Sequence, residues 1–429
     1  MTQKHLHTAP KLLAVLLAGL FAGSALFSGA TLAGVYVQCP GDLNGDADRL
    51  DAGEIIPAAH PRSVCMHLTA GDGFVKMADD AGKVLYSFGY HDVTGVMPAG
   101  PLGDGAGGVM ESGMLAAEFA APTIALKQGD EFYLTLTNVG MVMRPDLFDP
   151  HTVHFHGFPQ AAPVFDGMPE GSIAVNMGSS LTYYYNVIEP GTFMYHCHVE
   201  ATEHMQMGML GSLYVTPAQN GQRFEYPTGS GKFYTRFVYN DGDGSTGYDV
   251  ELPLQLGSFD PAFHDLHIGV QPLPFALMKD TYSMLNGRGY PDTVNTAPLT
   301  PPAENGGKVS QPLSSLVTAN AGQKVLLRLS NLSVTNFYTV TALGLPMKVV
   351  GAGAAILRGP DPDGAGALKG KDLYYDTASV TLGGGESADV IVDTAGISAG
   401  TYFLYTTNLN YLSNNTEDYG GMMTEIVIR

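Results

Sequence analysis

Basic residues are scarce in this chain of 429 residues. It has 21 Lys and Arg against 41 Asp and Glu, which gives a formal net charge of −20 at pH 7. Proteins bind phosphate backbones mainly through basic side chains, so this charge balance excludes a nucleic-acid-binding surface. An acidic surface can attract metal cations or cationic reductants, and it can equally serve solubility alone.

A long hydrophobic repeat with helical spacing is also missing. Hydrophobic residues, 45% of the chain, occur instead in short runs that alternate with polar positions, as in residues 124–138 with a turn at Gly129-Asp130. Alternation with a period of two is typical of strands with one buried face. The sequence therefore predicts an all-β protein, and its length favours two or three domains.

The N-terminal segment, residues 1–33, has the pattern of a secretory signal peptide. Two Lys residues precede an apolar run over residues 12–27, and the small residues Ala30 and Ala33 offer a cleavage site. The run is long enough that a retained membrane anchor is the alternative. Both interpretations predict that the protein is exported, to the periplasm or outside the cell.

The chain contains three cysteines. In an exported protein two of them would normally pair, and Cys39 and Cys65 flank a polar, Gly-rich segment with little capacity for a core. We therefore predict a disulfide between them. Cys197 is left over, and it has a His on each side, which suggests a role other than bridging.

The composition divides the rest of the chain into four segments. Residues 34–110 are rich in Gly, Asp and Ala and are predicted to form an irregular extension, stapled by the disulfide. Residues 111–217 contain successive short strands and form a predicted first domain. Residues 218–230 resemble a linker, and residues 231–429 form a second strand-rich domain.

An internal repeat supports two copies of one domain. In each copy a Gly is followed nine positions later by Asn, and a Gly-Thr-aromatic strand comes later. These elements begin at Gly129 and Gly191 in the first copy and at Gly322 and Gly400 in the second. The first Gly-Thr-aromatic strand continues into His-Cys-His and the second into Thr-Thr-Asn. The fold of the repeat therefore does not itself require the His-Cys-His residues.

Two clusters of potential metal ligands lie within the first copy. Residues 151–157 read HTVHFHG and residues 196–209 read HCHVEATEHMQMGM. Side chains two positions apart in a strand share a face, so His196 and His198 point one way and Cys197 points the other. One strand can therefore supply two different sites.

A thiolate, a thioether and two imidazoles form the ligand set of an electron-transfer copper. The predicted set is His151, Cys197, His204 and a weak axial Met209, for which Met207 is the competing candidate. The remaining histidines of the two clusters are predicted to form a second, imidazole-only copper site: His154, His156, His196 and His198. Zinc is the alternative metal, but the single Cys and the Met argue against it.

These two motifs resemble those of the multicopper oxidases and, more distantly, of the copper nitrite reductases. The resemblance implies type 1 copper at the Cys197 site and type 2 and type 3 copper at the four-His site. The spacing of five between His204 and Met209 agrees with the family. The spacing of seven between Cys197 and His204 is two longer than in the usual oxidase and two shorter than in the nitrite reductases.

The resemblance extends over residues 122–429, because the second copy contains the further family marks LNGRGYPDT, KVLLRLSN and GLPMKVVG. It implies two cupredoxin-like Greek-key β-sandwich domains. It also implies a homotrimer, because in two-domain relatives the second domain of a neighbouring chain completes the copper cluster. In this chain the second copy offers only His264 and His267 as additional ligands, and Tyr338 occupies a position where a nitrite reductase has His.

Three functions follow from these expectations. The first is an oxidase in which a small-molecule or metal-ion reductant gives single electrons to type 1 copper and the His-bound copper reduces dioxygen. The second is a nitrite-reductase-like or electron-transfer protein, which is weaker because His154 would replace an acid. The third is copper handling without turnover, suggested only by the content of 19 Met.

A weaker motif lies near the N-terminus. Residues 42–54 read DLNGDADRLDAGE, with oxygen ligands at alternate positions as in a calcium loop. Ala47 stands where such a loop has Gly. A solvated acidic loop is the preferred interpretation, and calcium is the alternative.

Overall fold

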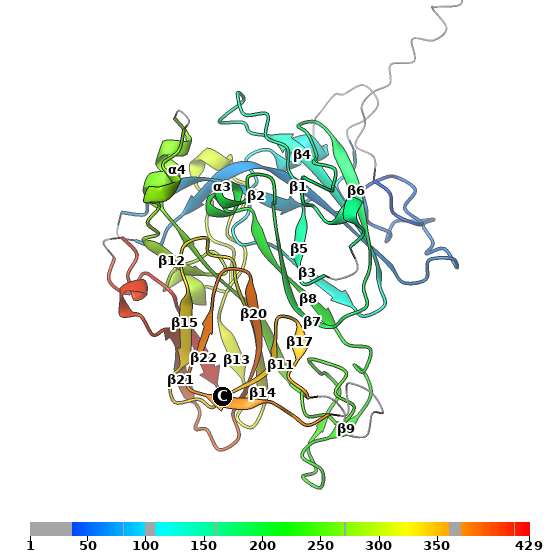
Figure 1. The fold of residues 1–429 in the computed structure, drawn as a ribbon, viewed down its shortest axis with the longest axis vertical. Coiled ribbons are helices and arrows are strands. Elements are labelled where there is room, and N and C mark those ends of the chain that lie inside the picture. The colour runs from blue at the N-terminus through cyan, green and yellow to red at the C-terminus, as the bar shows by residue number, and fades with distance from the viewer. Residues whose placement is uncertain are drawn as a thin grey trace, which may run out of the picture.

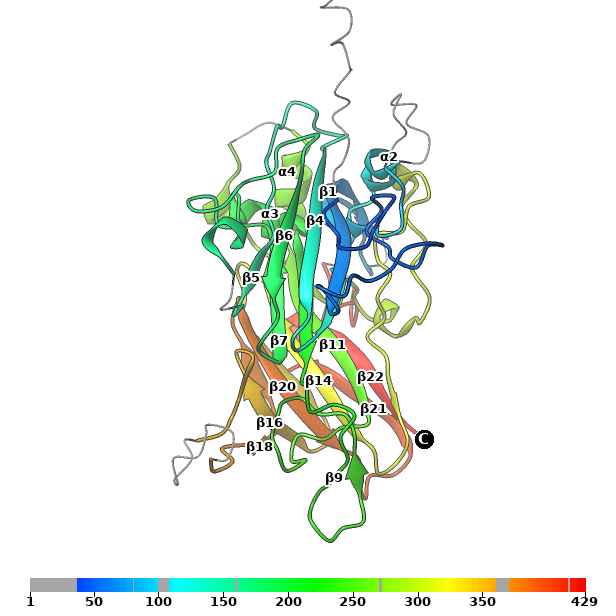
Figure 2. The ribbon, with the colours of Figure 1, turned by 90° about the vertical axis from the view of Figure 1, so that its right-hand side faces the viewer.

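The computed structural model describes residues 37–79, 81–98, 108–158, 161–269, 272–359, 370–415 and 417–429. The predicted signal peptide, residues 1–33, lies outside these ranges. Two strand-rich units are stacked along the longest axis of the molecule (Figure 1), and the side view separates their sheets (Figure 2). The predicted all-β class is confirmed. No helix in the described ranges combines the length and the hydrophobicity needed to cross a bilayer.

The first unit contains two four-stranded sheets, with the orders β2-β1-β4-β6 and β3-β8-β7-β5. The strands of the first sheet are β1 (Ser63–Lys76), β2 (Val84–Asp92), β4 (Glu131–Gly140) and β6 (Ser180–Asn186). Those of the second are β3 (Ala121–Lys127), β5 (His154–His156), β7 (Gly191–His196) and β8 (Leu210–Thr216). Aromatic and aliphatic side chains from both sheets form one buried core between them.

The second unit repeats this plan with larger sheets. The path of one sheet is β12-β11-β14-β20-β16-β17, with β18 paired to β16, and the other has the order β13-β22-β21-β15-β19. The first comprises β11 (Val250–Phe259), β12 (Tyr282–Leu285), β14 (Lys324–Asn331), β16 (Met347–Ala352), β17 (Ala355–Ile356), β18 (Tyr375–Thr377) and β20 (Glu386–Asp393). The second comprises β13 (Val317–Ala319), β15 (Tyr338–Ala342), β19 (Val380–Leu382), β21 (Gly400–Thr406) and β22 (Met423–Ile428).

Short elements complete the chain. Two strands, β9 (Phe224–Glu225) and β10 (Phe233–Tyr234), pair with each other around the segment predicted as a linker. The α-helices are α2 (Val109–Gly113), α3 (Ala201–Met207) and α4 (Pro261–His267). The 3-10 helices are η1 (Pro163–Phe165), η2 (Phe275–Leu277), η3 (Asp292–Val294), η4 (Ala303–Asn305) and η6 (Leu409–Leu412).

The internal repeat predicted from the sequence is also present in the strand pairing. Strand β4 is parallel to β1 and antiparallel to β6, and its counterpart β14 is parallel to β11 and antiparallel to β20. In the other sheets, β7 is antiparallel to β8 as β21 is to β22. The two units therefore share one topology, although only the first contains the His-Cys-His sequence.

The prediction of an irregular extension over residues 34–110 was wrong for its second half. Strands β1 and β2 lie there and form part of the first unit, as β11 and β12 do in the second. Their glycines reflect close packing, because a Cβ atom at Gly89 would lie 2.9 Å from the Cβ atom of Ala117. Buried strands of small residues lack the polar–apolar alternation by which strands are recognised.

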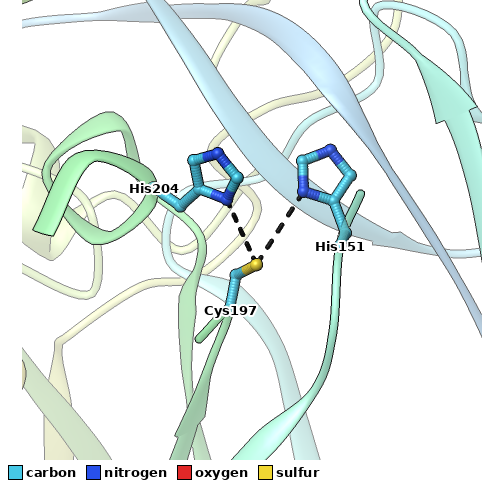
Figure 3. A group of neighbouring side chains, drawn as sticks. All are labelled: His151, Cys197 and His204. Carbon is cyan, nitrogen blue, oxygen red and sulfur yellow. Dashed lines mark hydrogen bonds between the residues drawn. The ribbon is translucent and has the colours of Figure 1, made fainter. Parts of the chain in front are cut away.

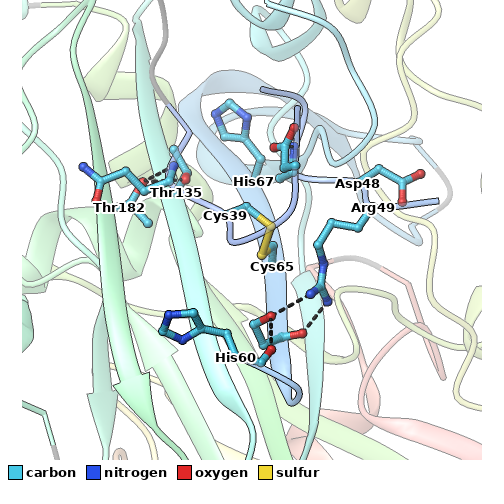
Figure 4. The surroundings of a disulfide bond; sticks show 12 residues. Cys39, Asp48, Arg49, His60, Cys65, His67, Thr135 and Thr182 are labelled. Atoms are coloured by element: carbon cyan, nitrogen blue, oxygen red, sulfur yellow. Dashed lines mark hydrogen bonds between the residues drawn. A yellow bond between two sulfur atoms is a disulfide. The ribbon is translucent and has the colours of Figure 1, made fainter. Parts of the chain in front are cut away.

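The predicted disulfide is confirmed, because Cys39 and Cys65 are bonded to each other. Cys65 lies in β1, so the bond ties the N-terminal loop to the first sheet (Figure 4). The Arg49 guanidinium donates a hydrogen bond of 2.6 Å to Ser63 Oγ beside it. The loop therefore has both a covalent and a polar attachment to β1.

Removing this bond should destabilise the protein. The two cysteines are 26 residues apart, and closing a loop of this size lowers the entropy of the unfolded chain by an amount worth about 3 kcal/mol. We expect the variant with Cys39→Ser and Cys65→Ser to lose about this much free energy of unfolding in a denaturant titration. Thiol reduction of the wild type is the control. Unchanged midpoints in both samples would contradict the expectation.

Candidate metal centre

Cys197 lies between two histidines at the end of β7 that faces α3. Its Sγ atom is 3.2 Å from His204 Nδ1 and 3.8 Å from His151 Nδ1 (Figure 3). All three side chains are buried. The backbone N–H of Thr152 also points at the sulfur, at 3.5 Å. A thiolate and two imidazoles thus converge on one point, the donor set expected of an electron-transfer copper.

The protonation states of this group suit metal binding. Burial alone would raise the pKa of Cys197, but the charge of His204 and hydrogen bonds from both histidines hold it well below its ordinary value. The thiolate and Asp149 in turn raise the pKa of His204 to about 10, against the effect of burial. The cysteine therefore loses its proton easily, which is the form that binds a metal, and metal binding would displace the proton of His204.

The free nitrogens of this group support the same assignment. In both His151 and His204 the Nδ1 atom faces the sulfur, while the buried Nε2 atom has no hydrogen-bond partner. Asp149 Oδ2 lies 3.9 Å from His204 Nε2, which is within ion-pair distance. Each ring thus presents its Nδ1 atom to the sulfur, from where two imidazoles and a thiolate can bind one metal ion.

A second group forms on the opposite side of β7. His154, His156 and His196 bring one ring nitrogen each within 4.8 Å of one another. His154 and His156 come from β5, which is antiparallel to β7 and places His154 opposite His196. The Nε2 atoms of His156 and His196 are only 2.9 Å apart. Both atoms are therefore close enough to bind one metal ion.

Backbone carbonyls fix the tautomers of the second group. The Nδ1 atom of His154 lies 2.6 Å from Asp166 O, that of His196 2.7 Å from Cys197 O, and that of His156 3.4 Å from Gly385 O. A carbonyl only accepts, so each Nδ1 carries the proton and each Nε2 keeps its lone pair. Metal-binding histidines commonly donate their other N–H in this way.

Burial favours the neutral form of two rings in the second group. It lowers the pKa of His196 to about 3 and lowers that of His156 as well. The ring of His198 adds a fourth imidazole next to this group, 4.9 Å from the ring of His154 between centroids. It is not part of the three-nitrogen cluster, so its role as a ligand stays a prediction.

The axial ligand of the first group also stays a prediction. Met209 and Met207 are both buried in the core of the first unit. The backbone carbonyl of Met209 accepts a hydrogen bond from Cys197 N at 3.2 Å, and its N–H donates to His204 O at 2.9 Å. Met209 is therefore held next to both ligands, which favours it over Met207.

His264 and His267, predicted as possible additional ligands, lie elsewhere. Both are buried in α4, and the nitrogens of His264 contact the carbonyl oxygens of Tyr86 and Gln206. His267 Nε2 lies 2.5 Å from Glu203 Oε1. The His-x-x-His spacing packs one face of α4 against the first unit of the same chain, and the role of these two residues as ligands stays a prediction. Neither ring is accessible to a neighbouring molecule.

The remaining predicted metal motif forms a compact loop. The Asp42 carboxylate accepts hydrogen bonds from the backbone N–H groups of Asn44, Gly45 and Ala47. Ala47 has a φ of 66°, the conformation that usually requires Gly at this place. In the described ranges, His, Cys and acidic side chains converge in the two groups above and not here. Calcium binding therefore stays a prediction.

A cleft of about 720 Å³ lies beside the first group. It is lined by Leu147, Asp149, Glu200, Ala201, Thr202, Glu203 and Phe275. Asp149 lines this cleft and also contacts the ring of His204. That contact holds the pKa of Asp149 below its ordinary value. We call this feature the His204 cleft. It combines carboxylates with an apolar wall next to a predicted copper ligand.

Comparison with known proteins agrees with this chemistry. Residues 106–220 match the model of the multicopper oxidase family, and this range contains all eight predicted ligands of the two copper sites. Residues 106–220 are thus similar to a multicopper oxidase domain, and the resemblance inferred from the two His motifs is confirmed.

Two curated relatives match parts of the chain. An L-ascorbate oxidase of Cucurbita pepo var. melopepo is 29% identical over 183 residues, 41% of this chain and 27% of the relative. A laccase of Aspergillus fumigatus is 32% identical over 105 residues, 24% of this chain and 16% of the relative. The chain therefore spans about a quarter or less of the length of the relatives that it matches.

Solved structures share the fold over most of the chain. A blue copper oxidase from Nitrosomonas europaea has a TM-score of 0.57 at 19% identity and covers 85% of this chain and 86% of its own. A copper nitrite reductase from the same organism has a TM-score of 0.54 at 15% identity, with 86% and 94% covered. At these identities the likeness establishes the cupredoxin-like fold alone.

Sequence reasoning missed the groups that hold the ligands in place. Asp149 precedes His151 by two positions, and an acid so close to a metal motif is a signal that was available. The contributions of the Asp166 and Gly385 carbonyls cannot be predicted from the sequence, because every residue has a backbone carbonyl.

Proposed function

We propose that this protein is a copper-dependent oxidase, in which a reductant is oxidised one electron at a time at the Cys197 site and dioxygen is reduced at the His154–His156–His196 site. One observation carries the proposal. Cys197 and His196 are consecutive residues whose side chains enter two different ligand groups. Two separate metal sites joined by one peptide unit suit electron transfer and have no obvious use in simple metal storage.

Copper held by these residues would supply one-electron oxidation of a reductant at the first site and reduction of dioxygen at the second. His151, Cys197, His204 and Met209 would hold type 1 copper. His154, His156, His196 and His198 would hold the second copper site. The hydrogen bond from His196 Nδ1 to Cys197 O, 2.7 Å long, shortens the route between the two groups.

The His204 cleft is the proposed docking place of the reductant. Its wall contains Asp149, whose carboxylate lies 3.9 Å from the buried Nε2 atom of His204. A small molecule in this cleft would therefore be separated from the first site by one imidazole ring. The carboxylates favour cationic reductants, and Leu147 and Phe275 favour those with an aromatic body.

Glu200→Gln tests this docking place. Two unit charges about 4 Å apart in water attract by about 1 kcal/mol, so losing the carboxylate should lower kcat/KM for a cationic aromatic amine about fivefold. A neutral phenol of the same size should be unaffected. Steady-state oxidation rates at low ionic strength measure both.

Asp376→Asn is the matched control for this charge change. Its carboxylate is on the second unit and 80% exposed, away from the His204 cleft, and should leave both rates unchanged. Equal losses for the amine and the phenol in Glu200→Gln would contradict cation docking.

We also propose that the protein is exported and homotrimeric. The disulfide supports export, because such bonds persist in oxidising compartments. The resemblance to two-domain relatives, which form trimers, supports association. Exposed apolar side chains on the second unit, including Phe337, Leu343 and Leu409, offer a surface for a neighbour. Light scattering should give three times the monomer mass, and a monomer would contradict the trimer.

The acceptor is the direct test of the oxidase. The copper-loaded protein, given excess reductant, should consume dioxygen without releasing hydrogen peroxide. Under anaerobic conditions it should leave nitrite unchanged. Nitrite consumption at a comparable rate would instead establish a reductase, and absence of both activities would leave copper handling as the function.

A further inference from the structure

The second unit contacts the second His group through a turn between β19 and β20. The Gly385 carbonyl lies 3.4 Å from His156 Nδ1, and these residues are 229 positions apart. The turn is closed by hydrogen bonds from Gly383 N to Glu386 Oε2 and from Gly385 N to Asn331 O, of 2.7 and 2.8 Å. A main-chain group of one unit thus faces a ligand ring of the other.

The imidazole of His156 occupies the space that a side chain at position 385 would need. A Cβ atom at this position would lie 2.9 Å from His156 Cε1 and 3.0 Å from His156 Nδ1. Real Cβ contacts are essentially never shorter than 3.0 Å, so the imidazole would have to move. Gly385 also has a φ of +89°, a conformation that favours glycine. Glycine is therefore required here both by the backbone and by the neighbouring ring.

The turn is also fixed relative to the strand that carries His196. Ser387 Oγ donates a hydrogen bond of 2.7 Å to Thr192 O, and Thr192 Oγ1 donates one of 2.5 Å to Asp389 Oδ1. Thr192 lies in β7 and both partners lie in β20. The Gly385 carbonyl, His156 and His196 are therefore held in one frame that spans the two units.

We propose that Gly385 is a positioning residue for the second copper site. Its carbonyl accepts the Nδ1 proton of His156 and its missing side chain sets the place of the ring, so that His156 Nε2 faces His196 Nε2. The second unit, which lacks His-Cys-His in its own repeat, thereby acts as a scaffold for the metal site of the first. The identity of the metal rests on the proposed function, whereas the orientation of His156 does not.

Gly385→Ala tests the proposal, and Gly322→Ala is its matched control. Gly322 lies in the turn before β14, has a φ of +88°, and a Cβ atom there would meet nothing within 4 Å. Both variants should lower the Tm through backbone strain, and Gly385→Ala should lower it further because its Cβ atom also meets His156. Only Gly385→Ala should lower the affinity for copper at the second site, by tenfold to a hundredfold in a chelator competition. The visible absorption of the Cys197 site should be unchanged in both.

A measurement on the copper-free protein separates this proposal from the proposed function. Long-range 1H–15N spectra of histidine-labelled protein report which ring nitrogen carries the proton, and His156→Gln assigns the signal. Wild type and Gly322→Ala should show His156 protonated at Nδ1, and Gly385→Ala should show a changed tautomer mixture. The same tautomer in all three samples, or equal copper affinity in the two alanine variants, would overturn the proposal.

Discussion

Cys197→Ser is expected to abolish the visible absorption of the copper-loaded protein and to lower the oxidation rate of any reductant by more than about a hundredfold. The reason is that Cys197 supplies the thiolate of the first group and also the peptide link to the second. A serine hydroxyl is a hard, neutral donor and does not replace a soft thiolate. Optical spectra and steady-state rates measure the two effects together.

Met194→Leu is the matched control for Cys197→Ser. Met194 is buried in β7, three residues before Cys197, and packs in a separate apolar cluster with Phe119 and Phe259. A swap that conserves volume should cost less than about 1.5 kcal/mol and keep the colour. Retained absorption in Cys197→Ser, or its loss in Met194→Leu, would contradict the assignment of the first site.

His156→Ala is expected to give the opposite pattern. The first group, His151, Cys197 and His204, stays complete, so the visible absorption should persist. The second group loses the imidazole whose Nε2 lies 2.9 Å from that of His196. Oxygen consumption should fall by more than about a hundredfold, while a reductant added without oxygen should still bleach the colour once.

His198→Ala extends the His156→Ala experiment to the residue outside the three-nitrogen cluster. If copper recruits His198, this variant should also keep its colour and lose oxygen reduction. Full turnover in His198→Ala would restrict the second site to three histidines. Full turnover in His156→Ala would place the site of oxygen reduction elsewhere in the protein.

The copper ligands are predictable from the sequence because their chemistry is local. A strand places alternate side chains on opposite faces, so the order His196-Cys197-His198 already implies two sites. The structure brings Cys197 together with His151 and His204, and brings His196 together with His154 and His156, as that alternation requires. The internal repeat of the sequence likewise corresponds to matching strand orders in the sheets of the two units.

Other features depend on contacts that the sequence does not encode locally. Strand β1 was missed because its Gly-rich stretch shows no alternation, and its place becomes visible only through its parallel pairing with β4. His264 and His267 have a spacing typical of ligands, but helix packing directs them to backbone carbonyls and to Glu203. The contribution of Gly385 arises from a residue 229 positions away from His156.

Copper quantification combined with optical and spin-resonance spectra of the purified protein decides whether the two His groups bind copper at two different sites. We expect one copper per chain with strong thiolate absorption, together with further copper that lacks this absorption and is bound at the second His group. Four coppers per chain would indicate a complete oxidase cluster, and two would indicate a smaller second site. A protein that takes up Cu(II) and stays colourless, or that holds a single copper per chain, would contradict this expectation.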